Sequence, residues 1–248
     1  MREAILMSQL RWSRLPALAA APALAVLAVT GCSGGSGSPH AAQAASGSAS
    51  TPSAATASYS ASQLRGALLT KINGQSPAAP VESGAYGSLA AVKATKNSLT
   101  GVSVKPAACA QTTVTGFNSP SFAKVPATVS TFKVGDNGVS EVLLAPSTAT
   151  AAQAMRNQIP ANCARYSATT KGKTFVYTVS EQSVRNLGQA ARAMNIKATG
   201  AESINVWSVV YRGSDFVGAV TIVGPGASAN VVTTLAAQAY AHAAKTLH

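Results

Sequence analysis

The chain has 248 residues and a formal net charge of +12, from 19 lysines and arginines against seven aspartates and glutamates. Such a surplus of positive charge suits a protein that works beside anionic lipid head groups or wall polymers. It does not indicate a nucleic-acid-binding protein, because the basic residues are scattered, form no run and have no interleaved aromatic residues.

The first residues have the pattern of an export signal. Arg2, Arg11 and Arg14 precede an uncharged stretch at 15–29 that is rich in Ala, Leu and Val. This stretch is only about 15 residues long, whereas a membrane-spanning helix needs about 20. We therefore expect residues 1–31 to be a signal peptide and not a membrane anchor.

A short motif follows directly. Val29-Thr30-Gly31-Cys32 resembles the lipobox of bacterial lipoproteins, an aliphatic residue and small residues before a cysteine. The resemblance implies a diacylglyceryl group on Cys32, with palmitate-type acyl chains, that anchors the protein to the extracellular face of the cell membrane. The alternative is that Cys32 is an ordinary thiol and that the signal is cut elsewhere.

The segment after the motif is expected to be a flexible linker. Residues 33–58 are nearly all Ser, Gly, Ala, Thr and Pro and contain no charged side chain. Such a composition buries too little apolar area to offset chain entropy. We assign residues 32–58 to the lipidated cysteine and its linker, and residues 59–248 to one folded domain.

The first half of this domain contains signals for helices and a hairpin. Ser60 and Gln63 have the spacing of a capping box, which predicts a helix over 60–71. Residues 80–89 are expected to be extended, and a helix is possible around 107–114. Two β-rich runs flank Asp136-Asn137-Gly138, and the Asn-Gly pair supplies the positive φ angles that a tight hairpin requires. The runs are 128–134 and 139–145.

The second half contains a further helix and more strands. Ser147 can begin a helix that Pro160 ends, and 174–180 alternates like a strand. Runs at 204–211 and 216–223 are predicted to form a hairpin whose two-residue turn, Gly213-Ser214, would pair Tyr211 with Phe216. Both faces of this hairpin are mostly apolar, so we expect the sheet either to be covered on both sides or to have one side that faces a cleft.

The last helix has the clearest pattern. Ser228 can cap it, and an apolar stripe follows, formed by Val231, Val232, Leu235, Ala236, Ala239, Tyr240, Ala243 and Leu247. Antiparallel strands bracketed by helices predict an α+β domain with an antiparallel sheet flanked by helices.

The cysteines and histidines indicate a disulfide and no metal. With Cys32 lipidated, Cys109 and Cys163 form an even pair in an oxidising compartment, which predicts a disulfide bond. The histidines, His40, His242 and His248, have no zinc-ligand spacing. We expect neither a metal nor another cofactor.

No catalytic pattern stands out, so we do not expect an enzyme. No Gly-x-Ser-x-Gly elbow occurs in the domain, and the Ser-x-x-Lys tetrads that begin at Ser121 and Ser130 lack the Ser-Asp-Asn and Lys-Thr-Gly motifs of penicillin-interacting enzymes. The acidic residues Glu141, Glu181 and Glu202 lie in or beside predicted strands, where they are expected on a solvated face. A hydrolase is the less favoured alternative.

The order of these elements resembles a family, the actinobacterial lipoproteins and the extracellular sensor domain of PknH-type receptor kinases. The resemblance rests on the tether, the first helix, a cysteine near 109, a hairpin, a helix before Cys163, further strands and a final helix. It covers about residues 60–248, with one cysteine pair where that sensor domain has two. It implies a ligand bound in a cleft beside the sheet.

These observations predict a non-catalytic ligand-binding or sensor-like lipoprotein, with a structural wall-associated protein held by charge as the alternative. Its expected partners are the membrane, through the lipid, and an anionic wall polymer or a small apolar ligand. One face of the second hairpin offers a candidate ligand site at Asn205, Trp207, Tyr211 and Phe216, where Gly218 would leave a gap. The alternative is that this face is plain core under the final helix.

Overall fold

The computed structural model describes residues 58–112, 115–156, 159–200 and 203–247. The predicted signal peptide, Cys32 and the linker up to residue 57 lie outside the described residues, as do His40, Glu202 and His248.

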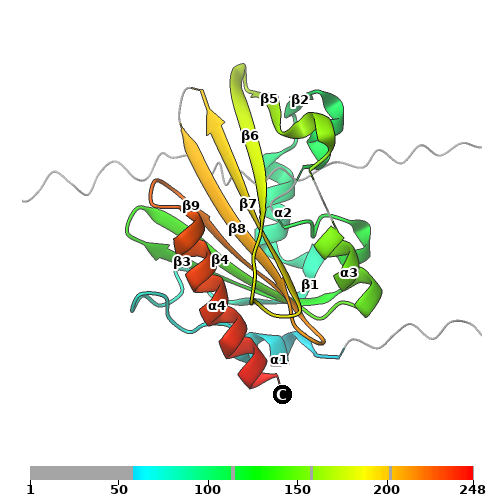
Figure 1. The fold of residues 1–248 in the computed structure, drawn as a ribbon, viewed down its shortest axis with the longest axis vertical. Helices are drawn as coiled ribbons and strands as arrows, with labels where there is room; N and C mark the ends of the chain where they lie inside the picture. Colours follow the sequence, from blue (N-terminus) through cyan, green and yellow to red (C-terminus); the bar gives the residue numbers. More distant parts are fainter. Residues whose placement is uncertain (1–57, 113–114, 157–158, 201–202, 248) are drawn as a thin grey trace, which may run out of the picture.

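The described residues form one antiparallel sheet of nine strands, in the order β1-β3-β4-β9-β8-β7-β6-β5-β2 (Figure 1). This confirms the predicted α+β class. The strands are β1 (Glu82–Ala85), β2 (Ser103–Lys105), β3 (Pro126–Val134), β4 (Asn137–Leu144), β5 (Arg165–Thr170), β6 (Lys173–Ser183), β7 (Ala190–Thr199), β8 (Ile204–Arg212) and β9 (Val217–Val223).

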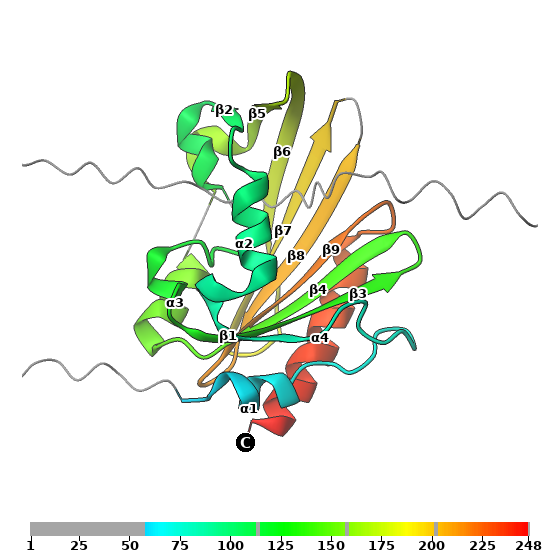
Figure 2. The same cartoon turned by 180° about the vertical axis from the view of Figure 1, so that it is seen from behind.

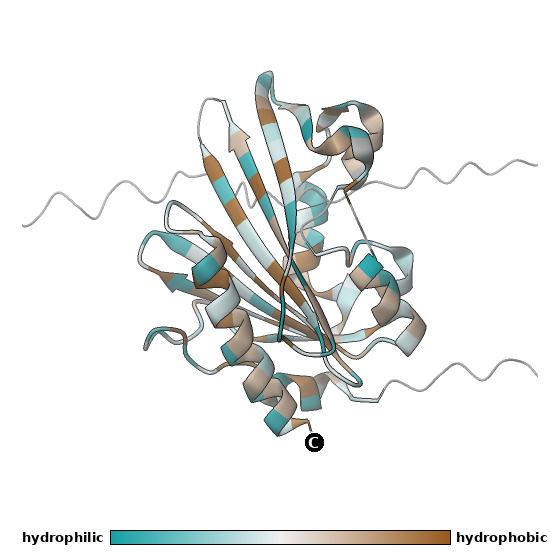
Figure 3. Cartoon of the chain, viewed as in Figure 1, coloured by the Kyte–Doolittle hydropathy of each residue, from teal (hydrophilic) through white to brown (hydrophobic). Residues whose placement is uncertain are grey.

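Helices cover both faces of this sheet. On one face lie α1 (Ala61–Gly66) and α4 (Ala229–Thr246), and on the other lie α2 (Ala90–Ser98) and α3 (Thr148–Arg156), as Figures 1 and 2 show. The strands alternate in hydropathy along their length (Figure 3). Each face carries its own buried apolar cluster, so the sheet is covered on both sides, the first of the two predicted alternatives.

The two helices of the α4 face begin where the sequence predicts. The Ser60 side chain accepts a hydrogen bond from the Gln63 N–H, and the Gln63 side chain accepts one from the Ser60 N–H. The helix α1 ends at Gly66, however, and not near residue 71 as predicted. Ser228 caps α4 through the N–H of Val231, whose own side chain is 45% exposed and does not belong to the buried stripe.

The two predicted hairpins form, but both turns are misplaced in the prediction. Val134 pairs with Asn137, so the first turn is Gly135-Asp136, and Gly135 carries the positive φ angle, 58°. In the second hairpin Tyr211 pairs with Gly218 and not with Phe216. The turn there is Ser214-Asp215, closed by a hydrogen bond from the Gly213 N–H to the Phe216 carbonyl oxygen (2.9 Å).

Other elements differ from the sequence analysis or were not predicted. The strands β2, β5 and β7 and the helix α2 have no counterpart in it. The helix expected at 107–114 is a 3₁₀ helix, η2 (Ala107–Gln111), and α3 ends at Arg156, before Pro160. None of the helices in the described ranges is long and apolar enough to cross a bilayer.

The predicted disulfide is present. It joins Cys109 in η2 to Cys163 in a second 3₁₀ helix, η4 (Ala161–Cys163), across 54 residues of sequence. Both cysteines are fully buried, in a cluster with Tyr166 and Met194. The bond fixes the segment before β5 to the segment that follows β2, and so holds the sheet edge formed by these two strands.

Candidate functional site

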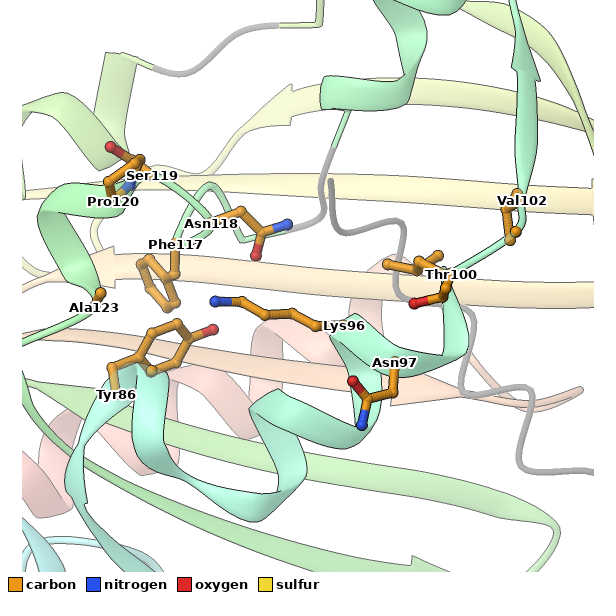
Figure 4. A pocket seen from close by; sticks show the side chains of 13 residues that line it. Tyr86, Lys96, Asn97, Thr100, Val102, Phe117, Asn118, Ser119, Pro120 and Ala123 are labelled. Carbon is orange, nitrogen blue, oxygen red and sulfur yellow. The ribbon is translucent and has the colours of Figure 1, made fainter. Parts of the chain in front are cut away.

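A cleft of about 600 Å³ lies on the α2 face of the sheet (Figure 4). A volume of this size falls in the range of small-molecule sites. Three segments that are distant in sequence line it, namely the 3₁₀ helix η1 (Tyr86–Ser88), the end of α2 with the turn after it, and the loop around η3 (Pro120–Phe122). The lining residues are Tyr86, Gly87, Lys96, Asn97, Leu99, Thr100, Gly101, Val102, Phe117, Asn118, Ser119, Pro120 and Ala123.

Aromatic rings form the inner end of the cleft. Tyr86 and Phe117 pack edge to face, with 6.0 Å between ring centroids, and Phe117 packs in turn on Phe122 at 5.3 Å. Both phenylalanines are buried. Burial also raises the pKa of Tyr86 to about 12, from an ordinary value that already leaves the hydroxyl protonated at physiological pH and able to donate a hydrogen bond.

The helix α2 forms one wall, and a strand from outside the cleft holds its N-terminus. Its N-cap residue, Leu89, offers no side-chain oxygen. The carboxylate of Glu82 in β1 accepts the Ala91 N–H instead, at 3.1 and 3.2 Å. A carboxylate at a helix N-terminus is favourable both for the free N–H groups and for the helix dipole.

The opposite wall is held by backbone contacts and by one buried arginine. Gly87 donates its N–H to the carbonyl oxygen of Ala123 (2.9 Å), and a Cβ atom at Gly87 would lie 3.1 Å from that oxygen. Arg192 in β7, 5% exposed, donates to the carbonyl oxygens of Thr115 (3.0 Å) and Ala154 (3.2 Å). The arginine thus joins the sheet to α3 and to the loop that carries Phe117.

The arginine also has an acidic neighbour. Its Nη1 atom lies 3.8 Å from Glu181 Oε1 on β6. Burial lowers the pKa of the guanidinium, and the nearby carboxylate partly offsets this effect. The loop that forms this wall is therefore fixed by a charged group that is buried and paired.

The lining combines aromatic rings with polar side chains. The thirteen residues include polar amides and hydroxyls and one charged side chain, Lys96, but no histidine, cysteine or carboxylate. The described residues also contain no group of three or more His, Cys, Asp or Glu placed to hold a metal.

The candidate ligand residues taken from the sequence lie on the other face, under α4. Tyr211 and Phe216 are 0% and 3% exposed and pack edge to face with each other. Both rings also contact Tyr240 of α4, at centroid distances of 5.8 and 6.1 Å. Phe216 also borders a small pocket of about 90 Å³ at the end of the hairpin.

The prediction of a gap at Gly218 was wrong. The ring of Tyr211 lies over that glycine, because the two residues are direct partners in the true register. Trp207 is partly buried against the same cluster. Asn205 donates to the Ala227 carbonyl oxygen and accepts from Asn195, both at 2.8 Å, so its amide supports the start of α4. The structure therefore brings the four residues together on one face of the sheet, where they lie beside α4 or its start.

The prediction of a solvated face for Glu141 was also wrong. This side chain is fully buried under α1, where its Oε2 accepts the Leu69 N–H at 2.9 Å. Burial raises the pKa of Glu141 to about 7, and the bond from Leu69 opposes this rise. The sequence does contain a signal for this burial. Glu141 stands two residues from both Val139 and Leu143, and residues two apart in a strand lie on the same face, so Glu141 shares their apolar face.

The serines of the two Ser-x-x-Lys tetrads lie in different surroundings. Ser121 is exposed in η3 and contacts Ser119 and Gln153. Ser130 is buried within β3, where residues three apart point to opposite faces, so Lys133 lies on the other side of the sheet.

Neither a protein-family model nor a curated protein sequence matches the chain. Two solved structures are similar to it at low identity. The extracellular domain of PknH from Mycobacterium tuberculosis is 16% identical with a TM-score of 0.41, over 58% of this chain and 78% of that one. An uncharacterized protein from Mycobacterium smegmatis is 14% identical with a TM-score of 0.36, over 59% and 76%. Similarity at this level carries no information about a ligand.

Proposed function

We propose that the protein is a non-catalytic ligand-binding lipoprotein on the outer face of the cell membrane, and that a small ligand occupies the cleft beside α2. The observation that carries this proposal is the cleft itself, which has an aromatic inner end, polar rims and walls held by Glu82 and Arg192. Mostly apolar concave sites with a few placed polar groups are typical of ligand pockets.

Two features support a location outside the cytoplasm. The Cys109–Cys163 bond is of a kind that persists in oxidising compartments and is rare in the cytosol. The first 31 residues have the composition of an export signal, and Cys32 stands where a lipidated cysteine belongs. A stable anchor needs more than one acyl chain, which a diacylglyceryl group provides.

The anchor is tested by changing Cys32 alone. We expect the wild-type protein to sediment with membranes and to partition into detergent, and Cys32→Ala to appear in the culture medium with its disulfide intact. Cys32→Ala that stays with washed membranes would contradict the lipid anchor.

The cleft is tested by filling it. Thr100 is exposed at the rim, so Thr100→Trp places a large ring over the opening without disturbing the core. Thr234→Trp on the exposed side of α4 is the matched control. We expect native mass spectrometry of an envelope extract to detect a small molecule on wild type and Thr234→Trp and to miss it on Thr100→Trp. Equal binding by all three proteins would place the ligand elsewhere.

The charge surplus favours a second candidate, a structural protein held to anionic wall polymers. Cleavage before Cys32 leaves a net charge of about +10. Exposed ionic contacts are screened within about 8 Å at physiological ionic strength, so this candidate predicts that salt alone releases Cys32→Ala from isolated walls. Retention at high salt would count against it.

A further inference from the structure

The charge that lines the cleft is positive only. Lys96 is the charged residue among the thirteen that line the cleft, and no acidic side chain is among them. Among the described residues, no carboxylate forms an ion pair with Lys96; Arg192 is the cation paired with Glu181. An ammonium group beside apolar walls, without an anionic partner from the protein, favours an anionic group from a ligand.

The direction of the lysine side chain strengthens this argument. Figure 4 shows Lys96 extending from α2 across the cleft, with its Nζ atom directed toward Phe117 and the hydroxyl of Tyr86. The hydroxyl of Tyr86 makes no hydrogen bond with another described residue, and like any tyrosine hydroxyl it carries its proton at physiological pH. Two donors therefore converge at the aromatic end of the cleft.

We propose that the cleft selects small organic anions whose apolar or aromatic body packs on Tyr86 and Phe117 and whose anionic group binds the Lys96 ammonium and the Tyr86 hydroxyl. This inference rests on the proposed function, because it names the ligand class of the same cleft. Carboxylates, sulfonates and phosphates share the required chemistry, since each accepts charge-assisted hydrogen bonds from these two donors.

A pair of fluorescent probes isolates the anionic group. The probe 8-anilinonaphthalene-1-sulfonate carries a sulfonate, and N-phenyl-1-naphthylamine has the same ring system without it. We expect wild type to bind the sulfonate more tightly than the neutral probe, and Thr100→Trp to weaken both because it fills the cleft. The control Thr234→Trp is expected to leave both unchanged.

The lysine is then tested against its neighbour on the same helix. Lys93 is exposed one turn before Lys96 and does not line the cleft. Gln has nearly the same helix propensity as Lys, so Lys96→Gln and Lys93→Gln each remove one charge without disturbing α2. We expect Lys96→Gln to weaken the sulfonate about tenfold, the size of one lost charge-assisted hydrogen bond, and to leave the neutral probe unchanged. Lys93→Gln is expected to change neither.

The outcomes separate this inference from the proposed function. If Thr100→Trp weakens both probes but Lys96→Gln does not weaken the sulfonate more than Lys93→Gln does, the cleft binds ligands and its preference for anions is overturned. If Thr100→Trp weakens neither probe, both the ligand cleft and the anion preference are overturned.

Discussion

The ring of Tyr211 on β8 lies against the backbone of Gly218, its direct partner on β9. A Cβ atom at Gly218 would lie 2.2 Å from Tyr211 Cζ, which is far inside van der Waals contact. The tyrosine is fully buried and is held from above by Tyr240 of α4. The glycine is therefore required by the ring that covers it.

This relationship predicts the effect of a single methyl group. Gly218→Ala is expected to lower the free energy of unfolding by about 1–3 kcal/mol, the usual cost of overpacking. Gly138→Ala, on neighbouring β4, is the control, because a Cβ atom there meets nothing within 4 Å. Its effect should stay within about 0.5 kcal/mol. Urea denaturation measures both, and equal losses would show that the ring can move aside.

Glu141 predicts that the domain is more stable in mild acid. Burial raises its folded-state pKa from 4.5 to about 7, so below pH 7 the folded chain keeps a proton that the unfolded chain releases above pH 4.5. Its contribution to stability is therefore complete below pH 4.5 and is lost as the pH rises through 7. The full change is about 3 kcal/mol.

The variant Glu141→Gln removes this titration but keeps an oxygen for the Leu69 N–H. We expect it to be more stable than wild type at pH 8 and to show a flatter profile between pH 5 and 8 in thermal melts. Asp215→Asn, an exposed change in a turn, should keep the wild-type profile. A wild-type slope retained in Glu141→Gln would assign the pH dependence to another group.

The disulfide predicts a large loss of stability when it is removed. A closed loop of 54 residues contributes about 4 kcal/mol on the chain-entropy model. The double variant Cys109→Ala/Cys163→Ala is expected to lose about that much in urea denaturation, whereas Cys32→Ala should lose nothing. Non-reducing peptide mapping of exported protein should yield one linked pair, and two free thiols at 109 and 163 would contradict it.

We predict that the hydrogen bonds of Arg192 stabilise the wall of the cleft by joining it to the sheet. Arg192→Lys keeps the charge near Glu181 but cannot donate to both the Thr115 and Ala154 carbonyl oxygens. We expect a loss of about 2 kcal/mol from the orphaned acceptors and faster amide hydrogen exchange over residues 115–119. Arg185→Lys, at an exposed arginine, is the control. Unchanged amide hydrogen exchange over residues 115–119 in Arg192→Lys would show that the loop keeps its conformation without these two hydrogen bonds.

The elements that could be predicted from the sequence are those whose signals are local. The apolar stripe of α4, the capping box at Ser60 and the β-rich runs of the two hairpins all lie within short windows. The predicted turns were one or two residues from the observed ones, because several neighbouring residues favour a turn at each place. Cross-strand packing, such as that of Tyr211 over Gly218, decides which of these positions becomes the turn.

The missing elements depend on distant partners. The N-cap residue of α2 makes no side-chain hydrogen bond to the helix, and the carboxylate of Glu82 in β1 takes that role instead. The strand β7 contains four alanines and one residue each of Met, Arg and Lys, all of which favour helices. It is a strand because residues 192–199 pair with β6 and residues 190–198 pair with β8.

The cleft could not be predicted for a similar reason. Tyr86, Lys96 and Phe117 stand in three separate segments, and no spacing along the chain records that the fold brings them together. The candidate residues taken from the sequence, around Trp207 and Tyr211, pack in the apolar cluster under α4.

The sheet ends in a very short strand on each side, four residues in β1 and three in β2. Beyond β1, the N–H of Ala78 binds the Thr131 carbonyl oxygen (2.7 Å) and occupies part of the open margin of β3. Copies held on one membrane by the proposed lipid anchor would meet at a high effective concentration, where long unpaired margins invite strand exchange and fibres. Edge strands this short each offer few unpaired backbone groups of their own to a neighbouring copy of the chain.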